Sequence, residues 1–272
     1  MQGLSLRAAM RSRRALQRPT RNLSAAEALP VPPGFFDNYP LFFSSSQTGA
    51  TRDRLNQRYR ACIEWNKTAI EGNRVLDITS HDGRWSFAAM KAGATSVVGL
   101  EARRHLVEAA RANLTEYRVD QSAFQFKCGD AFELLDGIEP HSFDTVLCLG
   151  FFYHVSNHML LLSKIARLAP KCLVIDTGVY PDPREIIKLD REDPDNDASA
   201  ARIDDNHHQG NIKHIVVGAP SRAALDLMLS GFGWSFVYYD WHQAAIARWN
   251  DCEDYKEGRR VTLRVNCETT IR

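Results

Sequence analysis

Residues 74–102 read RVLDITSHDGRWSFAAMKAGATSVVGLEA, a short apolar strand, a tight turn, an amphipathic helix and a second apolar strand. A helix between two such strands is typical of a parallel βαβ unit. A turn that binds a pyrophosphate carries three glycines in the order G-x-G-x-x-G. This turn keeps only the last glycine, because it reads Thr79-Ser80-His81-Asp82-Gly83. The stretch therefore predicts a nucleotide-type fold whose ligand places no pyrophosphate here.

Short apolar strands and amphipathic helices continue to alternate beyond this unit. We expect parallel strands at residues 74–78, 96–100, 124–128, 143–149 and 172–176. The last two strands, 234–239 and 260–267, have no full crossover between them, although a short helix at 244–249 would fit in the linker. Without a crossover they form an antiparallel hairpin. The sequence thus predicts an α/β fold with a doubly wound, mostly parallel seven-stranded sheet and an antiparallel terminal hairpin.

The composition gives no support for a nucleic-acid-binding, disulfide-rich or membrane-spanning protein. The chain has 272 residues, 44% hydrophobic and 25% charged, with a formal net charge of +1. That charge gives no general electrostatic argument for nucleic acid, although a local basic groove stays open. Six cysteines without a C-x-x-C pair indicate reduced packing residues. No apolar run approaches the ~20 residues of a membrane helix. We expect a cytoplasmic protein that has no membrane span.

The chain is expected to have three parts. Residues 1–33 form a disordered or targeting extension, because the first 30 residues hold six arginines and one acidic residue. This balance fits a mitochondrial transit peptide or a basic tail. An N-terminal aromatic flap and helix follow at 34–72, and the main domain spans 73–272 with a lid insertion at 178–218. The aromatic residues of the second part form either a flap over the acceptor or a strap packed on the sheet. They are Phe35, Phe36, Tyr39, Phe42 and Phe43.

The insertion carries three histidines near two aspartates, which are types of residue that bind divalent metals. They are His207, His208, His214, Asp204 and Asp205. Such groups in a polar loop are more often solvated, so no metal is expected.

Acidic residues stand at the ends of three predicted strands. Asp77 lies near the end of the first, Glu101 follows the second and Asp130 follows the third. Ligands of parallel sheets bind beyond these ends. A carboxylate at Asp77 suits an ammonium group, and Glu101 follows Gly83 by 18 residues, near the ~20-residue spacing of ribose-binding acids. Together they predict S-adenosylmethionine, a ligand with a ribose, an amino-acid end and no phosphate. Separately, Asp130 could merely cap a helix and Glu101 could be a surface residue.

The stretch 74–154 resembles the core of the class I S-adenosylmethionine-dependent methyltransferases, whose first motif runs D-x-G-x-G-x-G. Here the motif reads Asp77-Ile78-Thr79-Ser80-His81-Asp82-Gly83. Thr79 and His81 replace two glycines and tolerate a positive φ less well, so the backbone path through the turn is open. The resemblance implies a Rossmann-like fold, S-adenosyl-L-methionine as cofactor and methyltransferase activity (EC 2.1.1).

The resemblance also implies roles for individual residues. Asp77 and Gly83 would hold the methionine end, and Glu101 would bind the ribose. Asp130 would contact the adenine amino group with Ala131 beside the ring. Trp85 would either wall the cofactor or pack in the core. The predicted cofactor-binding set is Asp77, Ser80, Asp82, Gly83, Trp85, Glu101, Ala102, Asp130, Ala131, Leu149 and Gly150.

Methyl transfer from a sulfonium is an in-line displacement, which chiefly needs an aligned acceptor and little water. If a base is used, His154, beside Tyr153 and beyond the fourth strand, is the best-placed imidazole. These two residues are the predicted catalytic pair, although His154 could instead cap the helix that begins near Asn157.

Two short segments narrow the resemblance. They are LGFFYHVSNHMLLL at 149–162 and GAPSRAALDLMLSGFGW at 218–234, and both resemble parts of the tRNA wobble-uridine carboxymethyltransferases and of related small-molecule methyltransferases.

We expect a methyltransferase acting on a small-molecule acceptor. A tRNA-modifying transferase is the first alternative, and a non-catalytic cofactor-binding protein is the second. An NAD-dependent oxidoreductase has less support, because two pyrophosphate-binding glycines are missing. The sequence does not determine the oligomeric state.

Overall fold

A computed structural model describes residues 33–45, 51–192, 215–246, 249 and 251–268. The chain divides into two units between Pro33 and Gly34, and the second unit contains the helices and strands described here. The predicted extension, apart from Pro33, lies outside the described residues. So do the insertion's three histidines and two aspartates. Within the described ranges, no group of three or more His, Cys, Asp or Glu side chains could hold a metal ion.

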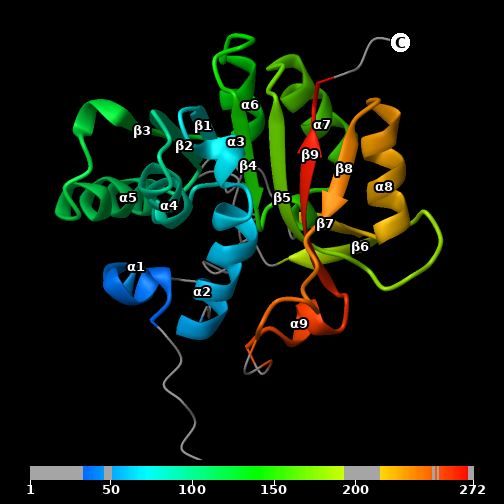
Figure 1. Ribbon diagram of the computed structural model, residues 1–272. Helices are drawn as coiled ribbons and strands as arrows, with labels where there is room; N and C mark the ends of the chain where they lie inside the picture. The colour runs from blue at the N-terminus through cyan, green and yellow to red at the C-terminus, as the bar shows by residue number, and fades with distance from the viewer. Residues whose placement is uncertain (1–32, 46–50, 193–214, 247–248, 250, 269–272) are drawn as a thin grey trace, which may run out of the picture. The chain divides into compact units, whose positions relative to one another are not determined.

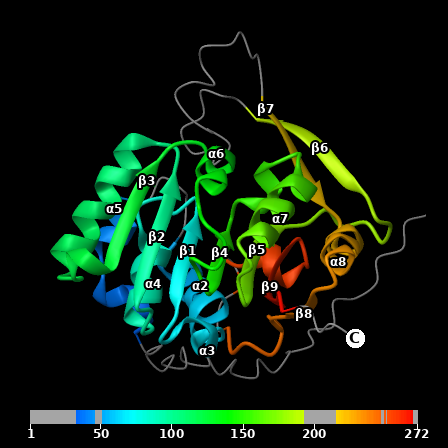
Figure 2. The same ribbon diagram turned by 90° about the horizontal axis from the view of Figure 1, so that it is seen from above.

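A seven-stranded sheet forms the centre of this unit, in the order β3-β2-β1-β4-β5-β9-β8 (Figure 2). β1 pairs in parallel with β2 and β4, whereas β9 runs antiparallel to both β5 and β8. The predicted fold class and terminal hairpin are therefore confirmed. The strands agree with their predicted bounds within two residues: β1 Arg74–Ile78, β2 Ser96–Glu101, β3 Phe124–Cys128, β4 Thr145–Leu149, β5 Cys172–Gly178, β8 Ser235–Tyr238 and β9 Arg260–Asn266.

Helices cover both faces of the sheet. They are α1 Leu41–Ser44, α2 Arg52–Tyr59, α3 Lys67–Ile70, α4 Arg84–Lys91, α5 Arg104–Glu116, α6 Ala131–Asp136, α7 His158–Arg167, α8 Arg222–Gly231 and α9 Glu253–Lys256. Side chains alternate along a strand, and in β4 Val146 and Cys148 join the core beneath α6, α7 and α8. Their neighbours Leu147 and Leu149 join the second core, beneath α2, α4 and α5. The continuous apolar run of β4 thus serves two cores.

Local signals fixed several helix ends. Thr51 Oγ1 accepts a hydrogen bond from the Arg54 N–H at 3.2 Å, and Ser221 Oγ accepts one from the Ala224 N–H at 3.0 Å. Both are N-caps, as their residue types favour. The helix proposed near 244–249 is wrong, since residues 244–246 and 249 are not helical. The linker helix is α9, where the buried Tyr255 stacks on Trp241 at 3.8 Å.

The insertion contains an antiparallel ribbon of two strands, β6 Ile187–Glu192 and β7 Ile215–Pro220 (Figure 2). Sequence patterning missed β6 because its two apolar residues, Ile187 and Leu189, are both exposed. Residues 193–214 lie outside the described part, and the role of the insertion as a lid stays a prediction.

The aromatic segment before α2 packs into the second core. Phe36 and Phe42 have no exposed surface. The Phe36 ring meets Trp85 edge-on at 5.7 Å, and Phe42 lies 5.2 Å from Phe87. Phe35 stacks on Tyr59 with ring centroids 4.0 Å apart. The segment therefore packs as a strap and does not have the exposed aromatic side chains of a flap.

A buried carboxylate, Asp176 near the end of β5, joins distant parts of the chain. It accepts hydrogen bonds from Arg58 at 2.9 Å, Arg260 Nε at 2.8 Å and the hydroxyls of Tyr255 and Thr262 at 2.7 Å each. Burial alone would raise the pKa of Asp176, but Arg260 and Arg58 outweigh it and hold the pKa well below its ordinary value. Figure 1 shows α2 and α9, the helices that these bonds reach, below the sheet.

The six cysteines lie in the described part of the chain as thiols, four of them buried. Across the described residues, no helix combines the length and apolar character that a membrane crossing requires.

Replacing Asp176 with Asn should lower the free energy of unfolding by about 3–5 kcal/mol, because two guanidinium groups would be left buried without their counter-charge. Urea denaturation followed by circular dichroism measures this. The matched control is D254N, which breaks the partly exposed Arg54–Asp254 pair at 2.6 Å and should cost less than the buried Asp176 pair. Equal costs for the two variants would contradict the central role of Asp176.

Candidate functional site

The predicted site residues gather at the carboxyl ends of the parallel strands. The turn 79–83 follows β1, Glu101 ends β2, Asp130 follows β3 and Gly150 follows β4. β1 lies between β2 and β4. From β1 the chain winds outward to β2 and β3, and it then crosses back to β4 on the other side of β1. A doubly wound sheet binds its ligand at such a switch point.

The turn has a left-handed backbone at the three glycine positions of the motif, although only the last of them is a glycine. Thr79, His81 and Gly83 occupy the three motif positions and have φ values of 58°, 53° and 79°. This conformation costs roughly 1–2 kcal/mol for a residue other than glycine. Local bonds offset part of the cost: the Thr79 hydroxyl donates to the Ile78 carbonyl at 2.6 Å, and the His81 N–H donates to Glu101 Oε2 at 3.0 Å. The structure thus gives the turn a positive φ at both positions where another residue stands in place of glycine.

Gly83 is the one motif position where space as well as conformation requires glycine. A Cβ there would lie 2.9 Å from the Cβ of Ala110 and 3.0 Å from Cδ1 of Leu114, both on α5. The close packing of α5 against the turn therefore explains why this glycine alone is kept.

Asp77 is a buried carboxylate at the end of β1. Its Oδ2 accepts a hydrogen bond from the Ser86 hydroxyl at 2.7 Å. Burial raises the pKa of Asp77 to about 7, and the nearby carboxylates of Glu101 and Asp82 add to the rise against the Ser86 bonds that lower it. Such a group favours a cation beside it.

Three buried polar atoms at this turn have no hydrogen-bond partner among the described residues: Asp77 Oδ1, Ser80 Oγ and His81 Nε2. Buried polar atoms without partners are uncommon and call for an explanation. A ligand with its own donors and acceptors would supply one.

Asp82 is bound within the protein. It accepts bonds from Arg84 Nε at 2.7 Å, Arg84 Nη2 at 2.8 Å and the Ser45 hydroxyl at 2.6 Å. Burial acts to raise the pKa of Asp82, but Arg84 and His81 hold it well below the ordinary value. The structure places this predicted ligand-binding residue where it ties the strap and α4 to the turn.

Glu101 and Asp130 both lie buried at strand ends. Glu101 is 2% exposed, so the surface interpretation is wrong. Its carboxylate accepts from the Arg103 side chain at 2.7 Å. Asp130 Oδ1 accepts from the backbone N–H groups of Phe132 at 2.8 Å and Glu133 at 3.1 Å. Asp130 therefore caps α6, and Ala131, the first residue of that helix, is buried beside it.

Trp85 packs in the core, which is one of the two roles that the sequence suggests for it. It is 3% exposed, meets Phe36 edge-on and carries the Arg58 guanidinium 5.0 Å above its ring. Ala102 is half-buried beyond Glu101.

Leu149 and Gly150 end β4 at the edge of the Asp176 cluster. Leu149 is buried, and Gly150 has a φ of 93°. A Cβ at Gly150 would meet Arg260 Nη2 at 3.4 Å and Arg58 Nη2 at 3.7 Å. Sequence analysis missed these arginines because the chain separates them from Asp176 by 84 and 118 residues.

Tyr153 and His154 share a single helical turn, Phe152–His154, after β4. Their rings lie 4.0 Å apart, and Tyr153 also faces the Arg260 guanidinium at 5.3 Å. His154 Nδ1 lies 2.6 Å from Oε1 of Glu192. The imidazole is therefore bonded to β6, and the N-cap of α7, Asn157, makes no side-chain capping bond.

Comparisons agree with this geometry. Residues 75–171 match a family model described as a methyltransferase domain. This match supports the class I S-adenosylmethionine-dependent methyltransferases as the family to which this chain is similar. Its fold is similar to that of solved structures. The N-terminal domain of EvdMO1 with SAH bound gives a TM-score of 0.54 at 19% identity, covering 82% of each chain. A methyltransferase from Mesorhizobium loti gives 0.53 at 15% identity, covering 77% of this chain and 96% of its own.

Curated relatives match this chain over part of its length. Ubiquinone biosynthesis O-methyltransferase of Neisseria meningitidis serogroup C is 26% identical over 121 residues, 44% of this chain and 50% of that protein. tRNA U34 carboxymethyltransferase of Trichodesmium erythraeum is 29% identical over 132 residues, 44% of this chain and 38% of that protein. The chain spans about half or less of the length of the curated relatives it matches.

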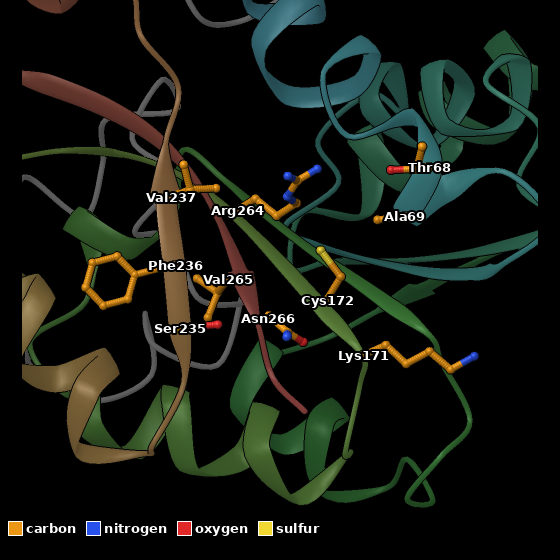
Figure 3. A pocket seen from close by; sticks show the side chains of 10 residues that line it. All are labelled: Thr68, Ala69, Lys171, Cys172, Ser235, Phe236, Val237, Arg264, Val265 and Asn266. Atoms are coloured by element: carbon orange, nitrogen blue, oxygen red, sulfur yellow. The ribbon is translucent and has the colours of Figure 1, made fainter. Parts of the chain in front are cut away.

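A groove of about 510 Å³ lies at the other end of the central strands (Figure 3). Cys172 begins β5 and pairs with Asn266, the last residue of β9, so the groove opens at the amino end of β5. Its lining residues are Thr68, Ala69, Lys171, Cys172, Ser235, Phe236, Val237, Arg264, Val265 and Asn266. None belongs to the predicted site, which occupies the opposite ends of the strands.

Glycine substitutions in the turn should have opposite signs. Thr79→Gly should raise the free energy of unfolding by about 0.5–1 kcal/mol, because relief of left-handed strain exceeds the entropy cost of glycine. Gly83→Ala should lower it by about 1–3 kcal/mol through overpacking and strain. Thermal unfolding measures both. Thr79→Val keeps the strain and is the control, and stabilisation by valine equal to that by glycine would refute the strain argument.

Proposed function

We propose that this chain transfers a methyl group from S-adenosyl-L-methionine to a small-molecule acceptor by in-line displacement (EC 2.1.1). The observation that carries the proposal is the left-handed turn with three unpartnered buried polar atoms, at the switch point of the sheet. The turn suits a ligand that has a cation and hydroxyl groups and no phosphate.

Each end of the cofactor finds a fitting group in this site. The Asp77 carboxylate is buried, and its Oδ1 has no hydrogen-bond partner among the described residues, so it would bind the α-ammonium group. Glu101 would accept hydrogen bonds from the ribose hydroxyls, and Asp130 would accept one from the adenine amino group beside Ala131. Leu149 and Gly150 would form the floor. When bound, the cofactor supplies an electrophilic methyl group on a sulfonium.

The acceptor is expected at Tyr153 and His154, beyond the end of β4. His154 would remove a proton from the acceptor oxygen as the new O–C bond forms and the C–S bond breaks, with the electron pair left on sulfur. An oxygen acceptor is favoured because two matched relatives are ubiquinone biosynthesis O-methyltransferases. The tRNA alternative has support from the tRNA U34 carboxymethyltransferase of Trichodesmium erythraeum, which matches 44% of this chain.

The non-catalytic alternative loses its main argument, because Thr79 and His81 keep the left-handed path that their side chains put in question. A cytoplasmic location, or a mitochondrial one if residues 1–30 are a transit peptide, is part of the same proposal.

Calorimetric titration tests the cofactor. We expect S-adenosylmethionine and S-adenosylhomocysteine to bind and NAD not to bind. Asp77→Ala and Glu101→Ala should each weaken binding by about 10- to 100-fold, because each removes a partner of a charged or hydroxyl group. Asp190→Asn, an exposed change on β6, is the control. No heat with either adenosyl ligand in a folded protein would refute the proposal.

Labelled cofactor then separates the acceptor classes. Incubation with a cell extract should label the small-molecule fraction. Label in tRNA alone would favour the tRNA alternative, and binding without any transfer would favour the non-catalytic one.

Binding of S-adenosylhomocysteine should weaken as the pH falls below about 7, approaching tenfold per pH unit. The sign follows from Asp77: its pKa of about 7 means that it loses its charge below that pH, and an ammonium group binds the charged form. Titrations between pH 8 and 5.5 measure the effect. Asp77→Asn should bind more weakly and show no such dependence, and a wild-type curve that stays flat to pH 5.5 would contradict the role of Asp77.

A further inference from the structure

The ribbon β6–β7 is held tightly against the segment that carries His154. His158 Nε2 lies 2.9 Å from the Gly218 carbonyl of β7. Burial lowers the pKa of His158, against the bonds that raise it, so the neutral ring donates its Nε2–H to this carbonyl. A Cβ at Gly218 would lie 3.1 Å from His158 Cε1 and 3.3 Å from the Val155 carbonyl. Only a glycine at 218 allows this approach.

This packing brings the last residue of β6 to the predicted base. Glu192 pairs with Ile215 in the ribbon, and its Oε1 lies 2.6 Å from His154 Nδ1. The two side chains are 20% and 10% exposed, so solvent screens their interaction only in part. A short bond between an imidazole and a carboxylate at this exposure is strong compared with a surface pair.

We propose that Glu192 is a positioning residue that fixes the His154 tautomer, with the proton on Nδ1 and the unshared pair on Nε2. The nitrogen that bonds to a carboxylate carries the proton, and the other becomes the base. The link from Nε2 to the acceptor rests on the proposed function, whereas the tautomer does not. The insertion thereby supplies a residue of the site's chemistry.

Other groups also lie near His154. The Tyr153 ring is tilted against the imidazole, and Arg260 lies over Tyr153 and is bonded to Asp176. His158, four residues on, is neutral. Glu192 is thus the carboxylate in direct contact with the imidazole.

Nitrogen NMR of the full chain labelled in histidine tests the tautomer without any acceptor. In the neutral form, His154 should show a protonated Nδ1 and an unprotonated Nε2, assigned by the signals lost in His154→Gln. Glu192→Gln should abolish this fixed pattern, and Asp190→Asn on the same strand should preserve it. A wild-type His154 with its proton on Nε2, or a pattern unchanged in Glu192→Gln, would overturn the proposal.

Rates of methyl transfer to the small-molecule extract test the consequence. Glu192→Gln should slow transfer by about 10- to 100-fold with the cofactor Kd unchanged. Glu192→Asp should restore part of the rate. A rate unchanged in Glu192→Gln would overturn the positioning role. The fixed tautomer with no transfer by the wild type would instead refute the proposed function.

Discussion

The structure depends most on one buried carboxylate. Asp176 lies at 0% exposure and is neutralised by Arg58 from α2 and Arg260 from β9. A buried charge is stable only when it is paired and hydrogen-bonded, so the two guanidinium groups have fixed positions. They lie beside Gly150, and Arg260 also faces Tyr153. The bond network that closes the fold therefore also forms one edge of the candidate site.

The turn after β1 separates two demands that a glycine-rich motif usually meets together. The left-handed path is needed at three positions, and Thr79 and His81 adopt it with help from local hydrogen bonds. Close packing is needed only at Gly83, beneath α5. The same turn buries Asp77 so completely that its pKa rises to about 7. The site thus combines a strained backbone with a carboxyl group of raised pKa, which is a common property of binding sites.

The ribbon formed by β6 and β7 adds a further residue to the site at the strand ends. His158 and Gly218 hold it in place, and Glu192 reaches His154 as a result. The ribbon thereby brings a carboxylate to a distance of 2.6 Å from the predicted base.

The sequence by itself determined the fold and the approximate place of the site. Strand and helix periodicity are local properties, and they predicted the sheet and its terminal hairpin. The strand-end positions of Asp77, Glu101 and Asp130 followed from the same pattern. Tertiary structure alone decided which side chains pair: Arg58 and Arg260 with Asp176, Glu192 with His154, and Trp85 with Phe36. These partners are far apart in the chain, and no periodicity records them. The exposed strand β6 was missed for a related reason, since its conformation comes from pairing with β7 and not from a buried apolar face.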